Sequence, residues 1–206
     1  MAEINQGIKI ILLGETSVGK TNLINAYCNL EFNKNPESTI ISSCIEKDYK
    51  YEKETYTCTL WDTAGQERYR AINKFIIRGS KIILIVYSID NRKSFNEVNF
   101  WLNYVKENVG DDKYIMALVA NKSDLYDSQE VEKEEGQEAA KNYGIEFLST
   151  SALNDRKRFQ EFVNELIEKY IEKYIQTEQK VNNSGNKNII INDKTNKDKN
   201  INKKCC

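Results

Sequence analysis

Four continuous apolar runs along the chain have the length and composition of strands that are buried on both faces of a sheet. They occupy residues 8–13, 82–87, 114–120 and 145–148. Two further segments, residues 44–51 and 55–61, have the composition of strands, and the turn around residues 52–54 joins them in a predicted hairpin.

Segments with apolar residues at helical spacing separate most of these strands. They cover residues 20–30, 94–108, 132–143 and 159–175. Strands that alternate with helices of this length indicate βαβ units. The pattern therefore predicts an α/β fold: a mostly parallel six-stranded sheet with one antiparallel edge strand and helices on both faces. Ligands of such sheets bind outside the carboxyl ends of the strands.

The pattern stops after about residue 177. Residues 182–204 are dominated by Asn and Lys, and residues 189–191 are their only apolar cluster. Such a segment cannot bury enough apolar area to offset its ordering entropy. We therefore expect one folded domain over residues 1–176 and a disordered tail over residues 177–206.

The amino-acid composition mainly excludes certain kinds of site and of protein. The chain has no His, which excludes His-based metal sites and Ser-His-Asp triads. Cys28, Cys44 and Cys58 are scattered through the periodic segments, which, with no secretory leader, argues for a reducing intracellular compartment. No apolar run approaches the roughly 20 residues of a membrane-spanning helix.

The formal net charge of -1 gives no argument for a nucleic-acid partner. The charge is unevenly spread, because residues 180–206 contain seven Lys and two Asp. That segment carries +5 and leaves -6 on the rest of the chain.

The first chemical signal follows the first apolar run. Residues 14–21 read GETSVGKT, which fits the phosphate-binding pattern G-x-x-x-x-G-K-[ST] between a strand and a helix. Gly14 and Gly19 permit a tight loop whose N–H groups hold phosphate oxygens, Lys20 reaches the β- and γ-phosphates, and the hydroxyl of Thr21 ligates Mg²⁺. The alternative is a Gly-rich turn with an accidental Lys-Thr. The motif indicates a nucleoside triphosphate, with ATP and GTP both open.

A second signal selects the base. Residues 121–124 read NKSD and directly follow the apolar run 114–120. A carboxylate at Asp124 can accept hydrogen bonds from the ring N–H and the exocyclic amine of guanine, which adenine does not offer there. A buried charged acceptor left unpaired discriminates by about 10⁴–10⁵. A plain surface turn is the alternative. The backbone amide of residues 150–152, after the next strand, would meet the guanine carbonyl oxygen.

Together these motifs resemble the Ras-like small GTPases. GETSVGKT, Thr39, WDTAGQE from residue 61, NKSD and TSA occur in the order and spacing of that family over roughly residues 7–176. The stretch WDTAGQERYR and the pair Cys205-Cys206 resemble the Rab branch. The resemblance implies a P-loop NTPase G domain that binds GTP and GDP with Mg²⁺, slowly hydrolyses GTP and regulates intracellular vesicle trafficking.

The resemblance also implies catalytic and metal-binding roles. Thr21 and Thr39 would ligate Mg²⁺, and Asp62 would hold the ion through a water. Gly65 would donate its N–H to the γ-phosphate, and Gln66 would orient the water that attacks it in line.

The other nucleotide contacts that the resemblance implies come from the phosphate loop, the segment after it and the base-binding loops. Phe32 would lie against the guanine ring. The remaining residues are Gly14, Thr16, Ser17, Val18, Gly19, Lys20, Asn22, Pro36, Asn121, Lys122, Asp124, Ser151, Ala152 and Leu153.

Several residues depart from the family pattern. Pro36 stands where a Tyr commonly covers the γ-phosphate, residues 40–44 read IISSC in place of Ile-Gly-Val-Asp-Phe, and Leu153 replaces the Lys of S-A-K. Ile76 stands where an aromatic is usual. These departures keep a second hypothesis open, a GTP-binding module with negligible hydrolysis that acts as an effector scaffold. A different P-loop ATPase is a third.

The partners implied by the resemblance are an exchange factor, a GTPase-activating protein, effectors, and a GDP-dissociation inhibitor or escort-type prenyl carrier, with no nucleic acid and a monomeric protein. Cys205 and Cys206 resemble a double geranylgeranylation site, and two lipid chains give stable anchoring. The positive tail would add attraction to anionic lipid. We therefore expect the protein on the cytoplasmic face of endomembranes, cycling with the cytosol.

Overall fold

The computed structural model describes residues 7–34, 43–63, 75–110 and 113–177 of the chain. Its centre is a six-stranded sheet with the strand order β2-β3-β1-β4-β5-β6. The strands are β1 Ile8–Leu13, β2 Ser43–Tyr51, β3 Glu54–Asp62, β4 Ile82–Ser88, β5 Ile115–Asn121 and β6 Glu146–Ser149. Only the edge strand β2 pairs antiparallel, with β3, among the strand pairs of the described residues. The predicted mostly parallel sheet is confirmed.

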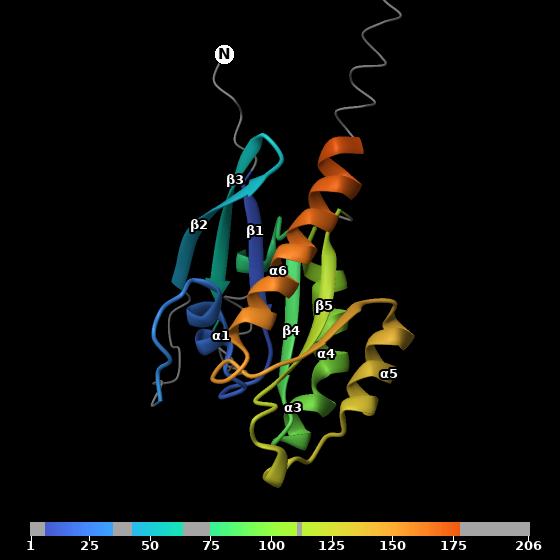
Figure 1. Cartoon of the computed structure of the whole chain (residues 1–206). Helices are drawn as coiled ribbons and strands as arrows, with labels where there is room; N and C mark the ends of the chain where they lie inside the picture. Colours follow the sequence, from blue (N-terminus) through green and yellow to red (C-terminus); the bar gives the residue numbers. More distant parts are fainter. Residues whose placement is uncertain (1–6, 35–42, 64–74, 111–112, 178–206) are drawn as a thin grey trace, which may run out of the picture.

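The described helices alternate with the parallel strands (Figure 1). They are α1 Lys20–Tyr27, α3 Arg92–Asn96, α4 Val98–Asn108, the 3₁₀ helix η2 Tyr126–Ser128, α5 Lys133–Tyr143, α6 Arg156–Tyr170 and the π-helix η3 Ile171–Gln176. None of these helices combines the length and apolar character that crossing a bilayer requires.

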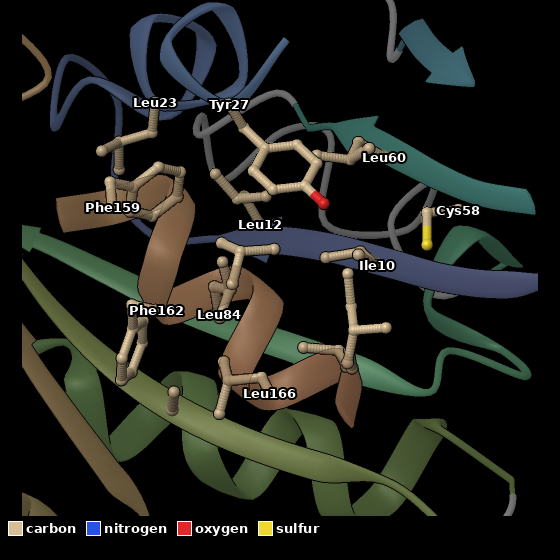
Figure 2. Close-up of a cluster of buried hydrophobic side chains, with 14 of the residues drawn as sticks. Ile10, Leu12, Leu23, Tyr27, Cys58, Leu60, Leu84, Phe159, Phe162 and Leu166 are labelled. Carbon is tan, nitrogen blue, oxygen red and sulfur yellow. The ribbon is translucent and has the colours of Figure 1, made fainter. Parts of the chain in front are cut away.

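Two clusters of buried hydrophobic side chains lie on opposite faces of the sheet. Strand β1 alternates between them: Ile8, Ile10 and Leu12 belong to the cluster of α1 and α6, whereas Ile11 and Leu13 belong to that of α4 and α5. Figure 2 shows the first cluster, where side chains of α1 and α6 cover β1 and β4. Each such buried aliphatic side chain stabilises the fold by about 1.5–3 kcal/mol. Helices therefore cover both faces, as predicted.

Several helix boundaries differ from the prediction. α1 ends at Tyr27 rather than near residue 30, because Asn29 has a left-handed backbone with φ 59°. The segment predicted as one helix over residues 94–108 is divided at Glu97, whose ψ of -6° lies outside the regular α-helical range, although the N–H of Trp101 still donates to its carbonyl. The last turns, Ile171–Gln176, are a π-helix rather than a continuation of α6.

The half-exposed edge strand β2 is held to the last helices by two tyrosines. The hydroxyl of Tyr49 donates to Glu168 Oε1 at 2.5 Å, and that of Tyr51 donates to Glu172 Oε1 at 2.8 Å. The two tyrosines are two residues apart on the strand, so their side chains lie on the same face of β2. Their acceptors are four residues apart on the helix, so both glutamates lie on the side of the helix that faces β2. These bonds fix β2 against α6 and η3.

Candidate functional site

The loop between β1 and α1 has a backbone that requires its two glycines. Gly14 has φ 144° and Gly19 has φ 94°, both in the region that favours glycine. A Cβ on Gly14 would overlap the carbonyl oxygen of Val86, and one on Gly19 would overlap the side-chain amide of Asn121. The loop therefore lies directly against β4 and the end of β5.

The ammonium of Lys20 is buried at the start of α1, and the residue is 6% exposed. Its Nζ donates to the carbonyl oxygens of Gly14 at 2.9 Å and Glu15 at 2.8 Å, so the side chain folds under the loop. Burial lowers the pKa of Lys20 to about 8, while the carboxylates of Asp62 and Glu15 act in the opposite direction. A desolvated cation beneath a loop at a helix N-terminus is suited to an anionic ligand.

Two of the predicted magnesium ligands meet in the structure. The hydroxyl of Thr21 donates to Asp62 Oδ2 at 2.7 Å. The next residue, Thr63, fixes the end of β3 beside β1, because its hydroxyl donates to the carbonyl of Leu12 at 2.6 Å. The described residues contain no group of three or more Cys, Asp or Glu side chains able to enclose a metal. A hydroxyl and one carboxylate fit Mg²⁺, which is usually bound by few protein ligands together with phosphate oxygens.

The side chain of Asn22 braces the segment that carries Phe32. Its Nδ2 donates to the carbonyl of Asn33 and its Oδ1 accepts from the N–H of Asn33, both at 2.9 Å. Phe32 is partly buried and packs against the hydrophobic cluster of α1 and α6. The braced segment thus leaves α1 in a defined direction.

Asn121 joins the predicted phosphate loop to the two loops that are predicted to bind the base. Its side chain is 1% exposed, its Nδ2 donates to the carbonyl of Val18 at 2.8 Å, and its Oδ1 accepts from the N–H of Ala152 at 3.2 Å. One amide therefore connects three segments that are far apart in the sequence.

Ser151 lies in the second loop that is predicted to bind the base and contacts Asp124 of the first. Its hydroxyl donates to Asp124 Oδ1 at 2.5 Å. The hydroxyl oxygen of Ser151 in turn accepts from the N–H groups of Leu153 at 3.1 Å and Asn154 at 3.0 Å. The carboxylate of Asp124 is thereby oriented from a loop that lies 27 positions away in sequence.

Sequence reasoning missed two residues at the end of β4. Lys122 Nζ lies 3.4 Å from Asp90 Oδ2, and the hydroxyl of Ser88 donates to Asp90 Oδ1. No motif marks Ser88 or Asp90. Their position at the carboxyl end of a strand central to the sheet is the signal that could have found them.

The structure thus brings Gly14, Val18, Gly19, Lys20, Thr21, Asp62, Asn121, Lys122, Asp124, Ser151 and Ala152 to one edge of the sheet. The predicted residues Pro36, Thr39, Gly65, Gln66, Cys205 and Cys206 lie outside the described residues.

Comparison with known proteins identifies the family. The model of the Ras family matches residues 9–183. Ras-related protein Rab-11C of Dictyostelium discoideum is 42% identical over 154 residues, which cover 75% of this chain and 68% of the relative. Ras-related protein Rab-11B of the same organism is 38% identical over 186 residues, covering 89% and 84%. Ras-related protein Rab2BV of Beta vulgaris is 38% identical over 161 residues, covering 77% and 75%.

These findings speak against the P-loop ATPase hypothesis and do not favour the scaffold without hydrolysis. They agree with the fold and with the arrangement of the phosphate and base-binding loops. A role in vesicle trafficking is typical of Rab proteins. The chain belongs to the Ras family as a Rab-like small GTPase that binds GTP and GDP with Mg²⁺ and hydrolyses GTP.

Proposed function

We propose that guanine nucleotide binds across the carboxyl edge of the sheet, with its phosphates on residues 14–21 and its base against residues 121–124 and 150–153. The observation that carries this assignment is the amide of Asn121, which bonds to Val18 of one loop and to Ala152 of the other. Because this bridge is buried and uses both ends of the amide, the two halves of the site keep a fixed separation.

At the phosphate end, the N–H groups of residues 14–21 bind phosphate oxygens. The residues of this phosphate site include Thr16, Ser17, Val18 and Asn22. Lys20 exchanges its carbonyl partners for phosphate oxygens, which compensates the buried ammonium. Thr21, Thr39 and Asp62 would hold Mg²⁺. When bound, Mg²⁺ neutralises charge on the β- and γ-phosphates.

At the base end, Asp124 accepts from the ring N–H and the exocyclic amine of guanine. The bond from Ser151 occupies only part of its capacity, since a carboxylate has about four acceptor sites. The N–H of Ala152 donates to the guanine carbonyl, the stem of Lys122 packs beside the base, and Phe32 covers the ring. Leu153, which is 45% exposed, borders the pocket.

For hydrolysis we assign Gln66 to orient the attacking water and Gly65 to donate its N–H to the γ-phosphate. Pro36 is assigned a place beside the γ-phosphate. Family membership supports both roles. Single-turnover release of γ-phosphate tests them: Gln66→Leu is expected to slow release at least about tenfold, because positioning supplies most of the acceleration. Gln129→Leu, remote from the proposed γ-phosphate site, serves as the control. Equal rates in Gln66→Leu and the unsubstituted protein would remove Gln66 from the mechanism.

Exchange factors, GTPase-activating proteins and effectors act on this family in general. We propose in addition that residues 177–206 form a flexible tether and that Cys205 and Cys206 each carry a geranylgeranyl group. A GDP-dissociation inhibitor or an escort-type carrier would cover these groups. The adjacent cysteines and the family support this, and the +5 charge of residues 180–206 favours anionic membrane.

The membrane proposal is tested with the tagged full-length chain in cells. The unsubstituted protein should divide between endomembranes and cytosol, and Cys205→Ser/Cys206→Ser should be entirely cytosolic. Each single Cys→Ser variant should bind membranes weakly, because one lipid chain gives only marginal anchoring. Undiminished membrane association of the double variant contradicts the proposal.

A further inference from the structure

An ion pair outside the nucleotide motifs holds the lysine of NKSD. Lys122 Nζ lies 3.4 Å from Asp90 Oδ2 and 3.5 Å from Asp90 Oδ1. The two side chains are only 31% and 23% exposed, so solvent screens the pair incompletely. The hydroxyl of Ser88, itself fully buried at the end of β4, donates to Asp90 Oδ1. The hydroxyl of Ser88 therefore orients the carboxylate of Asp90 that pairs with Lys122.

The backbone that carries Asp90 is fixed to the backbone that carries Lys122. The N–H of Ile89 donates to the carbonyl of Asn121 at 3.1 Å. The buried hydroxyl of Ser94 accepts from the N–H of Ser88 at 3.1 Å and donates to the carbonyl of Asn91 at 2.7 Å, which closes the turn between β4 and α3. Asp90 thus stands on a rigid turn that is joined to the residue before Lys122.

The nearest other cation of this turn has its own partners. Arg92 binds both carboxylate oxygens of Glu135 on α5, at 2.6 and 2.8 Å, and it also donates to the backbone carbonyl of Glu130. This fork-to-carboxylate geometry fixes the guanidinium toward α5. Asp90 is therefore left to pair with Lys122.

The backbone of Lys122 is in a conformation that side chains rarely adopt. Its φ is 62°, and its carbonyl accepts from the N–H of Leu125 at 2.9 Å. Left-handed backbone at a non-glycine residue persists when its surroundings determine it, and it concentrates at ligand sites. The ion pair to Asp90 is one of the contacts that hold Lys122 in place.

We propose that Asp90 is a positioning residue of the guanine-nucleotide site, which fixes the side chain of Lys122 as a wall of the base pocket and thereby slows nucleotide release. The proposal rests on the base site proposed above. Without the carboxylate, the ammonium of Lys122 is free to move into solvent and its stem no longer packs in one orientation.

The test is the dissociation rate of a fluorescent GDP analogue from the full-length protein with Mg²⁺. Asp90→Asn keeps the shape of the side chain and removes its charge. It is expected to speed release by about three- to tenfold, the size expected for one ordinary hydrogen bond when solvent partly screens the pair. Asp127→Asn, an exposed carboxylate in η2, is the matched control and should release GDP at the unsubstituted rate.

A double-mutant cycle separates positioning of Lys122 from a general effect on the fold. In a Lys122→Met background, which itself releases GDP faster, Asp90→Asn should add no further acceleration. If Asp90→Asn is not obtained folded, Ser88→Ala replaces it, with about twofold faster release expected because the bond that orients Asp90 is lost.

Two outcomes overturn the proposal: an unchanged release rate in Asp90→Asn, or the same acceleration with and without Lys122. Failure of the unsubstituted protein to retain GDP would instead contradict the proposed nucleotide site itself. The two failures are therefore distinguishable.

Discussion

The buried ammonium of Lys20 lowers the stability of the protein when no phosphate is bound. Its pKa is about 8 in the folded protein against an ordinary value of 10.5. The cost of keeping it charged is therefore roughly 3 kcal/mol. Between these two pH values the unfolded chain holds more protons than the folded one, so stability rises with pH. The cost is fully present below about pH 8.

Substitution of Lys20 exposes this cost. The free energy of unfolding of nucleotide-free Lys20→Met is compared with that of the unsubstituted protein at pH 7 and pH 10. Relative to the unsubstituted protein, the variant should become less stable by roughly 2–3 kcal/mol between these pH values, because only the unsubstituted protein gains stability from deprotonation of Lys20. Urea denaturation at both pH values measures the two free energies of unfolding. A difference that does not change with pH contradicts the burial of a charged group at this position.

At the residue scale, the motif GETSVGKT places Lys20 within reach of its own loop, but the sequence predicted phosphate partners for it. The bonds to the carbonyl oxygens of Gly14 and Glu15 were not predicted. Asp90 and Lys122 are 32 positions apart and belong to no common motif. Their pairing depends on β4 and β5 being neighbours in register, with Ser88 opposite Asn121, which composition alone does not specify.

At the element scale, α5 packs against the sheet through a glycine. A Cβ on Gly136 would overlap the hydroxyl of Tyr87 and would lie 2.7 Å from the ring of Phe147. Gly136 is therefore retained for close approach, since its φ lies outside the left-handed region. At Gly19 both close approach and the φ of 94° require glycine.

Gly136→Ala is expected to lower the free energy of unfolding by about 1–3 kcal/mol, because two packed rings and α5 must move apart. Gly7→Ala is the matched control, since the nearest atom to its Cβ would be 3.8 Å away. Urea denaturation of the GDP-bound proteins gives both values. Equal stability of Gly136→Ala and Gly7→Ala contradicts the described packing of α5.

The strands were easier to predict than the helix ends. A run such as β4, buried at every position, has one stable environment, the centre of a sheet. Helix ends depend on single residues: Asn91 caps α3 through its side chain, so that helix begins two residues before the predicted start. Nothing in the apolar spacing of residues 171–176 distinguishes a π-helix from an α-helix, because Ile171 and Ile175 are buried in either case.

At the scale of the whole molecule, the fold places chemistry from five segments on one edge. Parallel strands β1, β4, β5 and β6 end there, and β3 runs parallel to β1, so Asp62 arrives beside Thr21. The sequence predicted this gathering because carboxyl ends of parallel strands meet. It did not predict that one amide, that of Asn121, bonds to both Val18 and Ala152, since such a bridge depends on how close the two loops lie in space.

The most direct test of the account is base preference in Asp124→Asn. An Asn presents an amide N–H₂ where Asp presents an acceptor, so it suits the second carbonyl of xanthine rather than the amine of guanine. With Mg²⁺ present, the unsubstituted protein and Asp127→Asn should bind GDP about 10²-fold or more tightly than xanthosine diphosphate, and Asp124→Asn should reverse the order. A variant that keeps the preference of the unsubstituted protein for GDP would contradict the claim that Asp124 selects the base.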